Sequence, residues 1–198
     1  AAAMRQISDA LADMDAPEAD LLDAAIATEQ IYQELEAART GHQSRGFAES
    51  AVSGDTGALV DRSPLLGLGN PIAPPLHLHV DGETVVGAAT FGRQYEGPPG
   101  NVHGGMIATF CDMLLPISAH YLSADLARRF LPTISLQVDF LAASKLGAWV
   151  QGEAQLLRAT RSMVFMQGLV TADGQSVARV SGIFKIGPRF EDAPVTPT

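Results

Sequence analysis

The spacing of apolar residues along the chain changes character twice. In residues 1–40, leucine, isoleucine and alanine recur at roughly helical spacing beside an acidic face, which predicts an amphipathic helical cover. Residues 41–75 are dominated by Gly, Ser, Pro and Asn, and we expect a long irregular connection there, with a lid as one role for it. From residue 76 onward, apolar and polar residues alternate in short runs that one long apolar segment interrupts.

The alternating part predicts two strands, one helix and then four strands. Asp81-Gly82 and Asp173-Gly174 are hairpin turn signals. Residues 104–123 are apolar on nearly all sides of a helix, which is typical of a buried helix. These patterns predict an α+β fold in which an antiparallel sheet wraps around a central helix. The expected strands cover residues 76–80, 84–92, 133–141, 148–157, 163–171 and 177–186.

Length and charge narrow the classes of protein. A chain of 198 residues suggests one domain with an extension. We expect a helical and irregular extension over residues 1–70, a domain over residues 71–188 and a flexible tail over residues 189–198. Residues 1–100 contain 15 acidic and 5 basic residues, whereas residues 101–198 contain 7 acidic and 8 basic ones. The acidic first half argues against a nucleic-acid partner, while the second half can hold a basic patch for an anionic small molecule.

Cysteine content and hydropathy bear on the compartment. Cys111 is the only cysteine, so no intrachain disulfide can form. The first 30 residues contain no basic segment followed by a long apolar run, and no uncharged apolar stretch reaches 18 residues. We therefore expect a cytoplasmic protein that does not use a membrane as a partner.

The most specific motif is Asn101-Val102-His103-Gly104-Gly105, at the start of the expected helix. Amide groups at a helix N-terminus lack intrahelical partners and lie at the positive end of the helix dipole. Glycine lets a ligand approach these amides closely, so they suit an oxygen atom that becomes negative during a reaction. From the spacing alone, tight packing of the helix against the sheet is the alternative reading.

Two further features carry candidate chemistry. Asp112 lies nine residues after His103, and an ionised carboxylate in an apolar helix is costly unless it is paired. Catalysis, a salt bridge or an exposed position would each account for it. His77 and His79 could form a metal pair on one strand face, but no third ligand stands at a suitable spacing, so we expect no metal or other cofactor.

The tract Glu96-Gly97-Pro98-Pro99-Gly100-Asn101-Val102-His103-Gly104-Gly105, followed by Asp112 and a strand that begins at Thr133, resembles the PaaI-like group of hotdog-fold acyl-CoA thioesterases. The resemblance covers roughly residues 76–187. It implies a hotdog fold and the hydrolysis of an acyl-CoA to a free acid and coenzyme A without a cofactor. It also implies a homodimer or homotetramer, in which the helix start of one chain faces the aspartate of another.

The resemblance assigns roles to individual residues. Gly104 and Gly105 would bind the thioester carbonyl oxygen through their backbone amides. Asp112 would act as general base or as nucleophile, and Thr133 would help to hold the attacking water. His103 is expected to orient the turn rather than to act as the base.

The resemblance also points to substrate-binding residues. Lys145, Arg158 and Arg161 would meet the phosphates of coenzyme A, with solvated charges at strand ends as the alternative. One departure concerns Gly97, because many relatives carry a polar side chain six residues before the histidine. Asn101 could replace that side chain, or the backbone could suffice.

Two other functions stay open at this point. One is a non-catalytic acyl-CoA-binding hotdog domain, for which the missing side chain at Gly97 is the main support. The other is a hotdog dehydratase or hydratase that acts on acyl thioesters, although the usual histidine-containing signature is absent. The sequence does not name the acyl group, since the Leu, Met and Phe residues of the helix suit medium chains and aryl groups alike.

Overall fold

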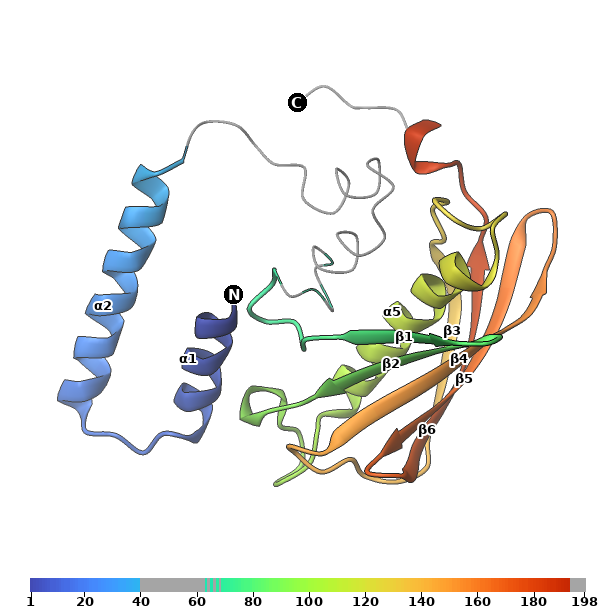
Figure 1. Cartoon of the computed structure of the whole chain (residues 1–198). Coiled ribbons are helices and arrows are strands. Elements are labelled where there is room, and N and C mark those ends of the chain that lie inside the picture. The colour runs from blue at the N-terminus through green and yellow to red at the C-terminus, as the bar shows by residue number, and fades with distance from the viewer. Residues whose placement is uncertain (40–62, 64, 66, 68, 193–198) are drawn as a thin grey trace.

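The structure is a computed structural model that describes residues 1–39, 63, 65, 67 and 69–192. A six-stranded sheet with the order β1-β2-β4-β5-β6-β3 curves around one long helix, α5 (Figure 1). Every neighbouring pair of strands is antiparallel. The predicted α+β class and the sheet wrapped around a central helix are confirmed.

The strands begin and end close to the predicted positions, and two Asp-Gly turns set one end of four of them. Gly82 and Gly174 both have positive φ, at 58° and 83°, and each closes a tight hairpin. The hairpins join β1 to β2 and β5 to β6. The strands are β1 (His77–Asp81), β2 (Thr84–Thr90), β3 (Thr133–Phe140), β4 (Trp149–Ala159), β5 (Met163–Ala172) and β6 (Gln175–Lys185).

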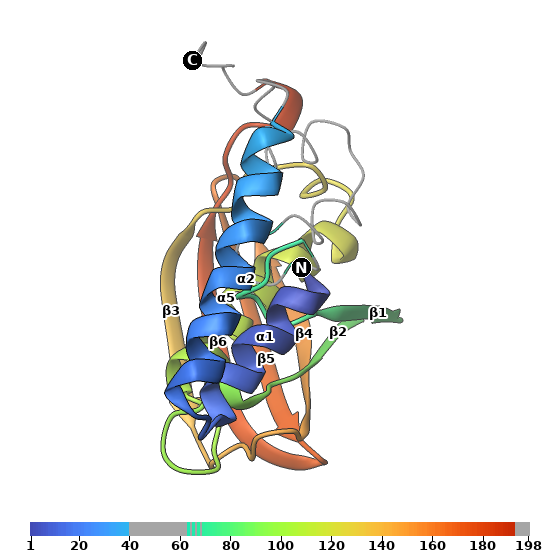
Figure 2. The same ribbon diagram turned by 90° about the vertical axis from the view of Figure 1, so that its left-hand side faces the viewer.

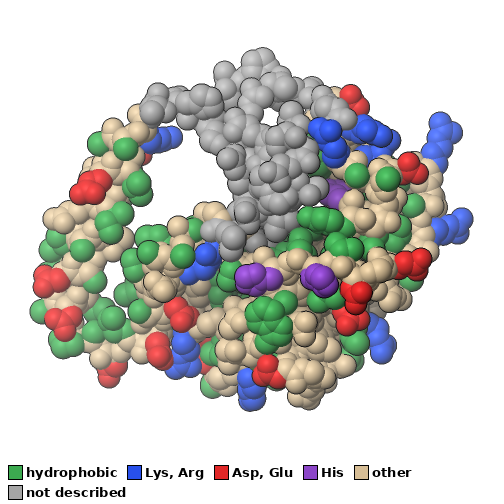
Figure 3. All heavy atoms as spheres, viewed as in Figure 1, with side chains coloured by type: hydrophobic (Ala, Val, Ile, Leu, Met, Phe, Trp, Pro, Cys, Tyr) green, Lys and Arg blue, Asp and Glu red, His purple; other side chains and the backbone are tan. Residues whose placement is uncertain are grey.

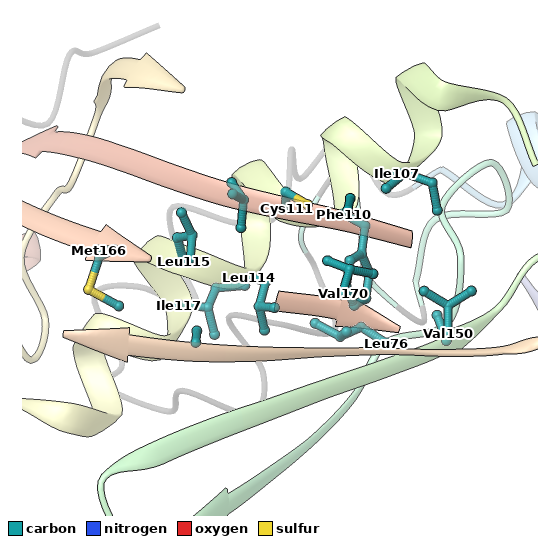
Figure 4. Packing of buried hydrophobic residues seen from close by; sticks show 14 of the residues in the cluster. Leu76, Ile107, Phe110, Cys111, Leu114, Leu115, Ile117, Val150, Met166 and Val170 are labelled. Atoms are coloured by element: carbon teal, nitrogen blue, oxygen red, sulfur yellow. The ribbon is translucent and has the colours of Figure 1, made fainter. Parts of the chain in front are cut away.

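Helix α5 (Gly104–Leu122) supplies the core with one broad apolar face. In Figure 4, Ile107, Phe110 and Leu114 extend from the helix among side chains of the sheet such as Val150 and Val170. The prediction that the helix is buried on nearly all sides is wrong, because a second face is only half-buried. This open face carries Met106, Thr109, Asp112, Met113 and Pro116.

Strand β3 forms one edge of the sheet, so one side of its backbone has no strand neighbour in the described chain. Its apolar residues are poorly covered: Ile134 is 55% exposed and Phe140 is 57% exposed. The register with β6 shifts between Thr133 and Ser135, which marks a β-bulge at Ile134. Because of the bulge, Thr133 pairs with the buried Phe184 and lies on the helix side of the sheet.

The N-terminal region forms two helices that differ in their attachment. Helix α1 (Ala2–Asp13) is fixed to the domain: Arg5 donates hydrogen bonds to the carbonyls of Ala73, Gly67 and Asn70, and Asp13 pairs with Arg93 at 2.8 Å. Helix α2 (Glu18–Ala37) has no buried residue and stands apart from the sheet (Figures 1 and 2). The predicted cover is therefore made by α1 alone, and most of the predicted irregular connection lies outside the described residues.

Two further findings concern the ends of the domain. Phe190, in the short helix η2 (Phe190–Asp192), is 4% exposed, so the predicted flexible tail does not begin at residue 189. Among the described residues, α5 is the one helix long and apolar enough to cross a membrane by length and composition, and here it is the core helix inside the sheet. The predicted division into extension, domain and tail otherwise stays a prediction.

Candidate active site

Asp112 and Thr133 form a hydrogen-bonded pair on the open face of α5. The Thr133 hydroxyl donates to Asp112 Oδ1 at 2.9 Å. The bulge at Ile134 makes this contact possible, because regular alternation would place Thr133 on the outer face with Ser135. Pro116 has no N–H, so the regular helical hydrogen bond to the Asp112 carbonyl is not made. The two residues that the resemblance assigned to water activation thus lie together.

The start of α5 offers one amide rather than two. His103 is the N-cap residue, and its Nδ1 accepts a hydrogen bond from the Gly105 N–H at 2.9 Å. The prediction that Gly105 presents a free amide to a ligand is therefore wrong. No described residue accepts a hydrogen bond from the Gly104 N–H. Gly104 lines a cavity of about 310 Å³. The bond from Gly105 holds the His103 ring against the first turn of α5, and its predicted role of orienting the turn for a substrate stays a prediction.

Packing explains why residue 97 is a glycine. A Cβ atom at Gly97 would lie 2.7 Å from the Cα of His103, so no larger residue fits without moving the turn. Asn101 does not replace the missing side chain through its amide nitrogen, since Nδ2 donates to the Pro99 carbonyl at 2.9 Å. Asn101 therefore holds the turn, and the backbone of Gly104 is the donor that remains.

The two halves of this site, the Gly104 amide and the Asp112 carboxylate, lie at different positions along the same helix, α5. Gly104 and Asp112 are eight residues apart on α5, which corresponds to about 12 Å along the helix axis. A carbonyl group bound to the Gly104 N–H is therefore too far from the Asp112 of the same chain for attack by a water held there. The Gly104 amide and the Asp112 carboxylate of one chain therefore lie at two separate places along α5.

A cavity of about 520 Å³ opens beside the Asp112–Thr133 pair. Most of its wall is apolar and comes from α5, from residues 129–132 and from the segment around Phe190. His120, which the sequence gave no role, also lines it, and its Nε2 lies 3.0 Å from the Arg129 carbonyl. No pattern in the sequence indicated that Phe130, His120 and Phe190 would meet here.

Burial acts on two other groups of the central helix. It raises the pKa of the Cys111 thiol to about 12, with a further contribution from the Asp112 carboxylate. Cys111 is thus a protonated core residue at neutral pH and not a nucleophile. Burial also lowers the pKa of His120, although the hydrogen bond to Arg129 opposes this change.

We predict a pH-dependent loss of stability from His120. The unfolded chain binds a proton at this side chain near pH 6.5, whereas the folded chain binds it only at lower pH. The free energy of unfolding should therefore fall as the pH decreases from about 6.5 toward the lowered pKa, by at most about 1.4 kcal/mol per pH unit. Urea unfolding between pH 5 and 8 measures this, and His120→Gln should flatten the curve. Parallel curves for the two proteins would contradict the prediction.

The predicted phosphate-binding residues lie at two ends of the domain. The backbone of Lys145 pairs with that of Asn101 in an isolated antiparallel β-bridge near the start of α5. Arg158 and Arg161 are exposed at the turn between β4 and β5, at the far end of β4, a strand about 35 Å long. In Figure 3, Lys and Arg side chains gather on the right-hand side, where this hairpin lies. Lys185, which the sequence analysis missed, pairs in register with Met163 beside Arg161.

The described residues contain no group of three His, Cys, Asp or Glu side chains close enough to hold a metal ion. His77 lies beside the Trp149 ring at 5.9 Å instead. His79 follows on the same exposed edge strand.

A family model described as the thioesterase superfamily matches residues 99–178, which include Gly104, Asp112 and Thr133. A crystal structure of a thioesterase superfamily protein is similar with a TM-score of 0.77 and 26% identity, over 92% of this chain and 87% of its own. The part of this chain that is similar therefore includes residues that precede β1. A comparison with curated proteins found no match.

Two solved structures, one with coenzyme A and one with acetyl CoA, are also similar to this chain. A hypothetical thioesterase of Streptococcus pneumoniae TIGR4, solved with coenzyme A, has 17% identity and a TM-score of 0.51, over 58% of this chain and 87% of its own. A protein of Streptococcus mutans UA159, bound to acetyl CoA, has 18% identity and a TM-score of 0.50, over 58% and 90%. The domain built around α5 therefore has the hotdog fold, and residues 99–178 within it match the thioesterase superfamily model.

Proposed function

We propose that this protein hydrolyses an acyl-CoA to a free acid and coenzyme A. The observation that carries the proposal is the Asp112–Thr133 pair beside an apolar cavity. The unoccupied amide of Gly104 at the start of the same helix complements it. The likeness to thioesterase superfamily structures, two of them with coenzyme A or acetyl CoA, supports the choice of substrate. A PaaI-like subgroup and a cytoplasmic location are part of the proposal.

Each residue has a defined part in the proposed reaction. Asp112 accepts a proton from a water that Thr133 helps to hold, and the water oxygen attacks the thioester carbon. The carbonyl oxygen becomes negative and is stabilised by the Gly104 N–H and the positive end of the α5 dipole. The C–S bond then breaks, the acid leaves, and the proton from Asp112 passes to the departing thiolate.

The route through water can be distinguished from attack by Asp112 itself. In water enriched in ¹⁸O, a single turnover by the proposed route places the label in the product acid and none in the protein. Attack by Asp112 would form an anhydride, and hydrolysis of that anhydride at the aspartyl carbon would leave the label in the aspartate. Mass spectrometry of the peptide that contains Asp112 reads the result.

The proposed site combines two copies of the chain. The separation of about 12 Å along α5 between Gly104 and Asp112 supports a site shared between chains, and the open face of α5 and the free edge of β3 offer surfaces for a second copy. In a two-fold dimer, Gly104 of each copy can approach Asp112 of the other, which gives two equivalent sites. We therefore propose a homodimer or homotetramer, which the mass of the protein in solution tests.

A site shared between two copies would also bring the separated basic residues to one substrate. Lys145 lies near Gly104. Arg158 and Arg161 lie at the other end of the sheet, which is also the end that holds Thr133. There the Lys185 N–H donates to the carbonyl of Pro132, the residue before Thr133. When Gly104 of one copy meets Asp112 of another, both basic groups border the same site. We propose that they bind the phosphates of coenzyme A.

We predict that replacing both Arg158 and Arg161 with glutamate raises KM for an acyl-CoA about tenfold or more, with little change in kcat. Hydrolysis of a short thioester of N-acetylcysteamine, which lacks phosphates, should be unchanged. Arg179→Glu, on the outer face of the sheet, is the matched control. Equal losses on both substrates would indicate structural damage instead.

Release of free thiol from acyl-CoA substrates tests the proposed function. Steady turnover of acyl groups of graded length, lost in Asp112→Asn, is the expected result. Tight binding of acyl-CoA without turnover would favour a binding domain, for which the glycine at residue 97 is the supporting observation. Addition of water to an enoyl-CoA without thiol release would indicate a hydratase.

A further inference from the structure

We infer that helix α2 is an arm that packs against a second copy of the chain, on the end of that copy's domain formed by residues 125–133, 158–163 and 184–192, which we name the basic end. The inference rests on the shared site of the proposed function, and it goes beyond that function by assigning an interface to a helix outside the hotdog domain. It follows from the surface of α2, from the place where α1 holds its start, and from charge.

Helix α2 exposes an apolar stripe along its whole length. Residues three and four positions apart share one side of a helix, and the stripe runs between two rows of acidic residues. None of the residues of α2 is buried, and Leu35 is 67% exposed. Helices in proteins gain most of their stability by packing such a face, so the stripe indicates a partner. The stripe contains Leu21, Ala24, Ala25, Ile31, Tyr32 and Leu35, and the acidic rows contain Glu18, Glu29 and Glu36 on one side and Asp20, Asp23 and Glu34 on the other.

The described part of the same chain does not cover this stripe. Helix α2 stands apart from the sheet (Figures 1 and 2), and hydrophobic and acidic side chains lie on the surface along it at the left of Figure 3. Its side-chain hydrogen bonds to described residues stay within the helix, as from Gln33 to Glu29, or join Glu36 to Arg39 just beyond it. The solved structure that is similar over 92% of this chain takes in at least part of α2, so a related chain has residues in this region as well.

Helix α1 holds the start of the arm beside the start of α5. Asp13, at the end of α1, pairs with Arg93 at 2.8 Å. Two residues further on, the Tyr95 carbonyl accepts the His103 N–H at 2.8 Å, and His103 caps α5. Four residues separate α1 from α2, so α2 begins within about 18 Å of Asp13. The arm therefore begins near Gly104.

The proposed shared site brings the basic end of the partner to this place. In that site, Gly104 of one copy meets Asp112 of the other. The Thr133 hydroxyl that donates to Asp112 belongs to the basic end. An arm that begins near Gly104 of its own chain therefore begins beside the basic end of the second copy, and two-fold symmetry makes this true of both copies.

The arm and the basic end carry opposite charges. The three segments of the basic end lie together, since a β-bridge joins Arg129 to Arg189 and the Ile186 N–H donates to the Ser162 carbonyl. They contain six basic and three acidic residues, in a chain with a net charge of −9. Helix α2 contains six acidic residues and no basic one. These charges favour contact between α2 and the basic end, and they oppose pairing of α2 with a second α2.

A photocrosslinker on the arm tests this contact. With p-benzoylphenylalanine in place of Ile31, irradiation should join two chains, and peptide mapping should place the link within the basic end. A mixture of ¹⁵N-labelled and unlabelled protein distinguishes links between copies from links within one copy. The same group in place of Gln30, on the acidic side of α2, is the control and should give little product. Links confined to one chain, residues 40–62 included, or no links at all would overturn the inference.

Charged substitutions in the stripe should weaken the association. Ile31→Glu together with Leu35→Glu should raise the Kd of the oligomer about tenfold or more, which sedimentation over a range of concentrations measures. Leu22→Glu together with Ile26→Glu makes the same chemical change on the opposite side of α2 and should leave the Kd as it is. All four residues are exposed, so both proteins should fold, and circular dichroism checks this. Equal values of Kd for the two variants would contradict the inference.

The crosslink also separates this inference from the proposed function. If the protein hydrolyses no acyl-CoA but the group at residue 31 links two copies at the basic end, the proposed function fails and the inference stands. If the protein hydrolyses acyl-CoA and the activity needs Asp112, but no link forms between copies, the inference fails and the proposed function stands.

Discussion

Replacing Asp112 with asparagine is expected to lower kcat for acyl-CoA hydrolysis at least about a hundredfold, the scale of a lost, positioned general base. The amide keeps the size of the side chain and can still accept a hydrogen bond from Thr133, so fold and acyl-CoA binding should remain. Thiol release under saturating substrate measures kcat, and calorimetry with S-hexyl-CoA measures binding.

Asp139→Asn is the matched control for this change. Asp139 lies on β3, on the outer face of the sheet, where its carboxylate accepts a hydrogen bond from Gln137. The same loss of charge there should leave kcat unchanged. An Asp112→Asn protein that retains more than about half of the original rate would show that this carboxylate is not the base.

Removal of the Gly104 amide hydrogen is the second change with a large expected effect. Proline is well tolerated at the first position of a helix, and His103, the residue before it, is extended with φ −61° and ψ 131°, as a residue before proline must be. Gly104→Pro therefore removes the donor and keeps the helix. We expect kcat to fall about a hundredfold to a thousandfold, as for other single oxyanion donors.

Gly104→Ala distinguishes the lost donor from crowding. An alanine Cβ at this position would lie 3.4 Å from Phe140 Cζ, which is an ordinary contact, and the N–H is retained. The alanine protein should thus be clearly more active than the proline protein. Equal activities would mean that bulk at this position, and not the hydrogen bond, sets the rate.

Most of the fold could be predicted because its signals are local. Alternation of apolar residues, two Asp-Gly turns and one long apolar segment predicted six strands and a central helix in the observed order. The same rules failed for the surroundings of the helix. Apolar residues such as Met106 and Met113 suggested complete burial, but residue type alone does not say whether a face is covered by the chain's own sheet.

The site was predicted less completely, because its geometry depends on irregular features. Alternation would place Thr133 on the outer face, and only the bulge at Ile134 brings it to Asp112. The capping bond from Gly105 to His103 removed one expected donor, and spacing does not reveal which amides a side chain will occupy. Phe190 closes the cavity from a segment whose proline content suggested a flexible tail.

The central claim is that each site takes Gly104 from one copy of the chain and Asp112 from another. Mixing Asp112→Asn and Gly104→Pro proteins under conditions that allow subunits to exchange tests it most directly. Half of the dimers in an equal mixture are hybrids, and each hybrid has one site with both original residues, so about a quarter of the original activity should return. If the mixture stays as inactive as its components while native mass spectrometry shows hybrid dimers, the site lies within one chain and the account is wrong.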